Sequence, residues 1–114
     1  MASKCEKLIA RFSPIAKPKK IKNGSYENWF ELHRDTPERA ELAGYIDEHP
    51  SPKSHLTWIM FERIERFLKE GYTAEQAVKR NMGPAKCPAL EIPYTLYAMR
   101  LEELLIEHGA KKCA

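Results

Sequence analysis

Apolar residues along this chain recur every three or four positions, the spacing of one helix face, and do not alternate as in a half-buried strand. Start and stop signals bracket several of these segments. Ser3 and Thr73 are each followed three residues later by Glu or Gln, the capping-box pattern, and Thr36-Pro37 is a further start signal. Gly71 is a typical helix end. The pattern therefore predicts helices over residues 3–12, 25–33, 36–49, 54–70, 73–81 and 93–108.

The helix over residues 54–70 has the strongest pattern, and we expect it to be the central one. Its apolar stripe is formed by Leu56, Ile59, Met60, Ile64, Phe67 and Leu68. Trp58 and Phe61 lie off this stripe and are a surplus of large apolar groups. The helices together predict a mostly α fold, a single small helical domain of five or six short helices over residues 1–114. Its expected core contains Trp29, Phe30, Ile46, Ile59, Ile64, Phe67, Val78, Leu101, Leu104 and Leu105.

Three segments lack a helical pattern. Residues 13–24 contain prolines, a glycine and several lysines, which is a linker composition. Their Asn23-Gly24 step suits the turn of a tiny hairpin between Ile21 and Tyr26, and Pro18 limits any strand there to a short edge. Residues 83–93 hold three prolines and are predicted to form an irregular loop. The tail, residues 110–114, has no group that would hold it in place.

Composition narrows the class of protein. A chain of 114 residues, 43% of them hydrophobic, supports one core. Its longest uncharged apolar run, Leu56 to Phe61, is far shorter than the about 20 residues that span a bilayer. The first residues form no signal peptide, and the three cysteines have no disulfide or metal-ligand spacing. We therefore expect a cytoplasmic protein that does not contact the membrane.

Charge is distributed unevenly along the sequence. Residues 1–22 carry seven Lys or Arg against one acid, and residues 23–50 carry seven acids against two arginines. The remaining residues contribute +2, which gives the net charge of +3. Such polarity indicates a protein that meets charged partners or folds one end against the other.

No residue pattern indicates catalysis. Cys87 lies between Lys86 and Pro88 in the predicted loop, without a nearby base to lower its thiol pKa. The four histidines are scattered, and His49 falls on an apolar helix face, where a hydrogen-bonded boundary role is typical. His33 is on a similar face, and phosphate-binding and metal-binding motifs are absent from the sequence. We expect no enzyme activity, no cofactor and no metal.

Nucleic acid is one class of partner that the charges allow. Lys17, Lys19, Lys20 and Lys22 could contact phosphates. Residues 54–108 could form a helix-turn-helix. However, the predicted loop is too long for that motif, and the helix after it has Arg100 as its only cation before His108. This alternative is a nucleic-acid-binding regulator.

A protein partner is the other class, and it is the one that we favour. The helix over residues 93–108 has a second apolar face at Leu96 and Met99, which suits either core packing or an interface. The acidic segment could face a basic surface, including one that otherwise holds nucleic acid. The predicted interface residues are Glu27, Trp29, Glu31, Glu38, Glu41, Tyr45, Asp47, Glu48, Leu96 and Met99. The alternative is that these acids pair with the N-terminal lysines of the same chain, and the charge pattern favours this pairing slightly over an acidic interface.

The sequence therefore predicts a non-enzymatic, small regulatory or inhibitory binding protein. A short, basic-then-acidic helical chain without a catalytic motif resembles the small regulators and inhibitors that phages and mobile elements encode. The sequence does not identify the partner.

Overall fold

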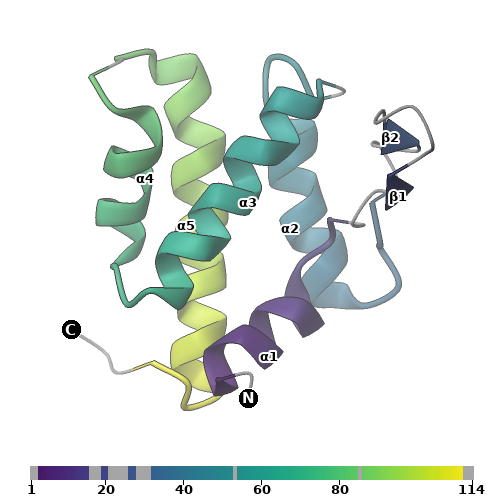
Figure 1. The fold of residues 1–114 in the computed structure, drawn as a ribbon, viewed down its shortest axis with the longest axis vertical. Coiled ribbons are helices and arrows are strands. Elements are labelled where there is room, and N and C mark those ends of the chain that lie inside the picture. Colours follow the sequence, from purple (N-terminus) through teal and green to yellow (C-terminus); the bar gives the residue numbers. More distant parts are fainter. Residues whose placement is uncertain are drawn as a thin grey trace.

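The computed structural model describes residues 3–15, 19–20, 26–27, 32–52, 54–84 and 86–111. Within them lie five helices: α1 (Lys4–Phe12), α2 (Pro37–Asp47), α3 (His55–Lys69), α4 (Ala74–Met82) and α5 (Pro88–Glu107). Two short strands, β1 (Lys19–Lys20) and β2 (Tyr26–Glu27), pair antiparallel (Figure 1). The predicted mostly α fold is confirmed. None of the described helices is long and apolar enough to cross a membrane.

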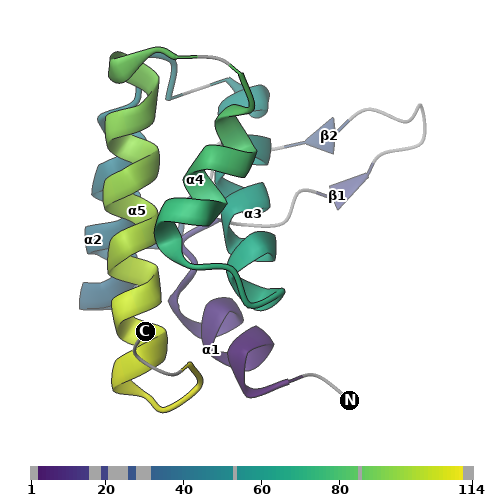
Figure 2. The same ribbon diagram turned by 90° about the vertical axis from the view of Figure 1, so that its left-hand side faces the viewer.

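The helices form two layers. α2 and α5 lie side by side in one layer, and α3 lies on the opposite side of the molecule (Figure 2). α5 packs against each of the other four helices, and α1 crosses the end where α5 finishes. The core between the layers includes six predicted residues, all buried: Ile46, Ile64, Val78, Leu101, Leu104 and Leu105. Trp29 and Phe30 lie outside the described residues.

The predicted helix starts at Ser3, Thr36, Ser54 and Thr73 are confirmed. The Ser3 hydroxyl accepts the Glu6 N–H, and the Thr36 hydroxyl accepts the Arg39 N–H. Thr73 and Gln76 form a complete capping box ahead of α4. Each cap satisfies backbone N–H groups that have no partner within the helix. The local sequence signals therefore place these boundaries correctly.

The prediction for the inward face of α3 was wrong in part, since only Ile64 and Leu68 of the predicted stripe are buried. Trp58 and Phe61 are fully buried, whereas Leu56 is 63% exposed and Ile59 and Phe67 are partly buried. Apolar residues occupy two adjacent faces of this helix, and the face with the larger aromatic area is buried. Phe61 packs edge-on against two tyrosine rings of α5, and the Trp58 indole N–H donates to the Pro52 carbonyl at 2.7 Å.

The predicted loop over residues 83–93 is shorter than expected, because α5 begins at Pro88 and not at Pro93. Pro88 stands in the first turn, where its missing N–H removes no helical hydrogen bond and its fixed φ favours the helix. Pro93 lies inside the helix and is buried. Pro93 comes little more than one turn after Pro88, so its missing N–H interrupts the helical hydrogen bonding only near the start of α5.

The predicted helix over residues 25–33 is also wrong where the structure describes it. Tyr26–Glu27 is a strand, Leu32 forms an antiparallel bridge with Ile15, and His33 lies outside any helix and is exposed. These pairings return the chain alongside the segment that follows α1, so tertiary pairing overrides the local helical pattern. The tiny hairpin is confirmed as an antiparallel pair, but Lys20 lies opposite Tyr26 in place of the predicted Ile21. Its predicted turn lies outside the described residues.

The segment after α5 is held, contrary to the prediction. The Lys111 ammonium pairs with Glu102 at 2.8 Å and donates to the Tyr72 carbonyl. Glu102 also accepts the Ala74 N–H at 3.0 Å, so this carboxylate connects α5 with the start of α4. A single ion-pair cluster thus fixes the chain at Lys111. The rest of the tail, including Cys113, lies outside the described residues.

Candidate functional site

The outer side of α5 presents apolar residues that none of the other described helices covers. Ile92 and Met99 are each 57% exposed and Leu96 is 39% exposed, and their spacing places them along one stripe of the helix. The opposite side of the same helix is buried through Tyr97 and Leu101. α5 is therefore apolar on two sides, and the core uses only one of them. Pro88, Glu91, Ile92, Thr95 and Leu96 line a shallow hollow of about 350 Å³ at one end of the stripe.

Arg100 joins this side of α5 to the acidic helix α2. Its guanidinium lies 2.8 Å from Glu41 of α2, 2.7 Å from Glu103 and 3.8 Å from Glu107. The Tyr45 hydroxyl donates to Glu41 at 3.4 Å, so this predicted interface residue lies beside the same carboxylate. One cation meets three carboxylates here, which leaves this surface negative.

We call this region the α2–α5 surface: Ile92, Leu96 and Met99, with Glu41, Tyr45, Arg100, Glu103 and Glu107 beside them. It brings together interface residues that were predicted from two separate segments, the acidic segment and the last helix. Glu103, Glu107 and Ile92 were not among them. Ile92 is four residues before Leu96, Glu103 is four after Met99, and Glu107 is four after Glu103. This helical spacing was the sequence signal that could have found them.

The other predicted interface residues lie elsewhere or outside the described part. Asp47 pairs with Arg34 at 2.5 Å, Glu48 is exposed at the end of α2, and Glu38 is partly buried. Trp29 and Glu31 fall outside the described residues, and the Glu27 side chain is not described.

Internal pairing of the acidic segment with the N-terminal lysines stays a prediction. Three acids of this segment form ion pairs with arginines in the described residues: Asp35 with Arg39, Asp47 with Arg34 and Glu41 with Arg100. Lys17 and Lys22 lie outside the described residues, and Lys19 and Lys20 are described by their backbone alone.

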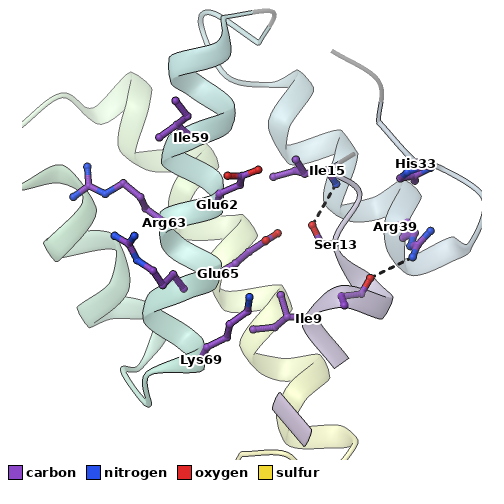
Figure 3. A pocket seen from close by; sticks show the side chains of 12 residues that line it. Ile9, Ser13, Ile15, His33, Arg39, Ile59, Glu62, Arg63, Glu65 and Lys69 are labelled. Atoms are coloured by element: carbon purple, nitrogen blue, oxygen red, sulfur yellow. Dashed lines mark hydrogen bonds between the residues drawn. The ribbon is translucent and has the colours of Figure 1, made fainter. Parts of the chain in front are cut away.

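A second hollow of about 520 Å³ lies between α1 and α3 (Figure 3). Glu62, Glu65 and Lys69 point from α3 across it toward Ser13 and Ile15. This cleft was not predicted, because the predicted inward face of α3 did not include Trp58 and Phe61. Once Trp58 and Phe61 are placed inward, helical spacing puts Glu65 inward as well.

Glu65 is the buried acid of this cleft. It is 7% exposed, accepts a 2.5 Å hydrogen bond from the Tyr97 hydroxyl and also bonds the Ser13 hydroxyl. Burial raises the pKa of Glu65 to about 7, and these hydroxyl donors offset part of that rise. Burial and the neighbouring carboxyl raise the pKa of Tyr97. Glu65 of α3 thus hydrogen-bonds Ser13 at the end of α1 and Tyr97 of α5, and its carboxyl links the three helices.

Cys87 and the histidines form no reactive group among the described residues. Cys87 is the N-cap of α5, and its carbonyl accepts two backbone N–H groups. His49 is buried and hydrogen-bonded, as predicted. His108 is the exposed C-cap of α5, with its ring 5.1 Å from that of Phe12. Burial raises the pKa of the Cys5 thiol, which opposes its activation.

Within the described residues, no three His, Cys, Asp or Glu side chains lie close enough together to hold a metal ion. The geometry therefore offers two surfaces and no assembled reaction centre in the described part. No protein-family model, curated protein or solved structure matches this chain.

Proposed function

We propose that this protein is a non-enzymatic regulatory or inhibitory binding protein of the cytoplasm that acts by occupying a surface of a protein partner. The observation that carries the proposal is the α2–α5 surface. A helix already buried on one side exposes three large apolar side chains on the other. Exposed apolar residues gathered on one stripe are typical of protein contact sites. The proposal assigns no catalytic residue, cofactor or metal.

The charge around the stripe supports a partner with a basic surface. Glu103 and Glu107 keep 60% and 52% of their side-chain area exposed although they pair with Arg100. Carboxylates at the edge of an apolar contact attract cations and speed the encounter. A surface that otherwise holds nucleic acid has this chemistry, and a protein that covers it would act as an inhibitor.

The test is affinity capture from cells of the source organism with a matched pair of variants. Leu96→Asp with Met99→Asp places charge on the stripe, whereas Leu56→Asp places it on an apolar residue of α3 that is more exposed than either. We expect the wild type and Leu56→Asp to retain the same partner and the double variant to lose it. Circular dichroism must show all three folded. A partner retained by the folded double variant would refute the proposal.

The alternative function, a nucleic-acid-binding regulator, rests on Lys17, Lys19, Lys20 and Lys22. Its second element, a reading helix at α5, is disfavoured because Arg100 already meets three carboxylates. Random duplex DNA distinguishes the two functions. Binding that falls steeply between low and physiological salt, and that disappears when the four lysines become glutamines, would favour the alternative.

A further inference from the structure

We infer that the occupant of the α2–α5 surface is a partner helix with an apolar stripe that continues into basic residues. This inference rests on the proposed function and adds the chemistry and shape of the segment that binds. It follows from the order of residues along the exposed side of α5. Ile92, Leu96 and Met99 come first, and Glu103 and Glu107 continue the same stripe.

The length and straightness of the stripe favour a helix over a loop. From Ile92 to Glu107 the stripe covers about 22 Å at 1.5 Å per residue. Side chains spaced by three and four residues form a ridge that packs into the groove of a second helix. Amphipathic helices bind such surfaces through residues at the same spacing. A matching helix needs about four turns to cover the stripe.

The acidic half of the stripe decides the charge of the occupant. Glu41, Glu103 and Glu107 surround Arg100, so one guanidinium faces three carboxylates. The C-terminal end of α5 adds the negative end of the helix dipole. Lysines or arginines on the occupant would pair with the carboxylates whose charge Arg100 alone does not neutralise.

The same charges disfavour a second copy of this chain as the occupant. In a symmetric pair of α5 stripes, the two copies would meet through the same patch, and the carboxylates of both would add to the same interface. Like charges brought together across an interface oppose association. The partner is therefore a different, basic chain.

Synthetic peptides test this inference without the natural partner. The probe is an 18-residue helical peptide of leucine and lysine, with leucines along one face of its first half and lysines on that face in its second half. Two controls are the same peptide with glutamates in place of the lysines, and an oligolysine of equal length. Binding is measured by fluorescence anisotropy of a labelled peptide at low and high salt.

We expect the leucine–lysine peptide to bind and both controls to bind at least tenfold more weakly. Leu96→Asp with Met99→Asp should abolish binding at every salt concentration. Glu103→Gln with Glu107→Gln should weaken it about tenfold at low salt and less at high salt, because salt screens exposed charges. The control Glu70→Gln with Glu75→Gln removes the same charge from exposed residues elsewhere and should leave binding unchanged.

Three outcomes would overturn the inference. Equal binding of oligolysine would show that charge alone attracts the peptide. If the Glu70→Gln with Glu75→Gln control weakened peptide binding as much as Glu103→Gln with Glu107→Gln, the position of the carboxylates on α5 would not matter. A dimer in sedimentation equilibrium that Leu96→Asp with Met99→Asp dissociates would assign the stripe to a second copy. Failure of the peptide with retention of a captured partner would leave the proposed function standing and would reject only the helical, basic occupant.

Discussion

At the scale of single residues, two buried titratable side chains respond to pH in opposite directions. Glu65 lies in the α1–α3 cleft beside Tyr97, and His49 lies past the end of α2 beside Tyr94. Burial disfavours the charged form of each. It therefore raises the pKa of Glu65 to about 7 and lowers the pKa of His49.

Glu65 should make the protein less stable as the pH rises. Below about pH 4.5 both folded and unfolded chains hold the proton, and between 4.5 and 7 only the folded chain does. The free energy of unfolding therefore falls across this window, by roughly 3 kcal/mol at full ionisation. Glu65→Gln keeps an oxygen for the Tyr97 hydroxyl and should lose this dependence. Urea unfolding from pH 4 to 8 measures it. The exposed Glu70→Gln should follow the wild type, and a parallel curve for Glu65→Gln would contradict the assignment.

His49 should act with the opposite sign. Its Nδ1 accepts the Ser51 N–H at 3.0 Å, so in the neutral ring Nε2 carries the proton and donates to the Tyr94 hydroxyl at 2.9 Å. Protonation at Nδ1 would break the first bond. Because the pKa of His49 is lowered, the unfolded chain binds its proton first as the pH falls below 6.5, and stability is lost. We expect His49→Gln, in the Glu65→Gln background, to remove the remaining acid sensitivity between pH 6.5 and 5. The same urea series checks it, and unchanged acid sensitivity would exclude His49 as its source.

At the scale of elements, the two phenylalanines of α3 should differ sharply. Phe61 is fully buried against Tyr94 and Tyr97, so Phe61→Ala should reduce the free energy of unfolding by about 3–5 kcal/mol. Phe67 is partly buried beside Tyr72, and its ring also lies under Arg63 and Arg66. Phe67→Ala should therefore cost clearly less than Phe61→Ala. Chemical denaturation of the two variants decides it, and equal losses would contradict this orientation of α3.

The sequence predicts elements well where the signal is local. The caps at Ser3, Thr36 and Thr73 predict the starts of three helices, because each side chain accepts a hydrogen bond from a backbone N–H only three residues away. The rotation of α3 could not be predicted in this way. Two adjacent faces are apolar, and the choice between them depends on the tyrosines of α5, which are far away in the sequence.

Proline and strand pairing explain the other differences. Pro93 has the local signature of a helix start, but the structure places it inside α5 because Pro88 already begins the helix. The strand at Tyr26 depends on a partner strand before it, which helical periodicity does not reveal. For the candidate site, Leu96 and Met99 were predicted from spacing alone. Their proximity to Glu41 through Arg100 is a tertiary contact and needed the structure.

At the scale of the whole molecule, Arg39 ties the N-terminal helix to the rest. From α2 its guanidinium donates to the Arg11 carbonyl at 2.8 Å and the Ala10 carbonyl at 3.3 Å, at the end of α1. It also pairs with Asp35 at 3.0 Å. Carbonyls at a helix end lack partners within the helix, and a cation there favours the dipole.

Arg39→Gln should therefore loosen α1 and reduce the free energy of unfolding by about 1–2 kcal/mol. The control is Arg34→Gln. Arg34 also pairs with an aspartate, Asp47, but both side chains of this pair are about half exposed, so the loss should be small. Amide hydrogen exchange over α1, together with urea unfolding, measures the effect. Equal protection of α1 in the two variants would show that Arg39 does not hold it.

The packing of every other helix on α5 has a consequence for how the chain is made. Ribosomes release α1 first and α5 last of the five, so α1 to α4 leave the ribosome before the helix that joins them exists. Until then Phe61 lacks the two tyrosine rings of α5 that cover it and α4 lacks the helix that it contacts most, and chains with exposed apolar surface are prone to aggregate. The described helices therefore cannot complete their packing during synthesis before α5 has left the ribosome.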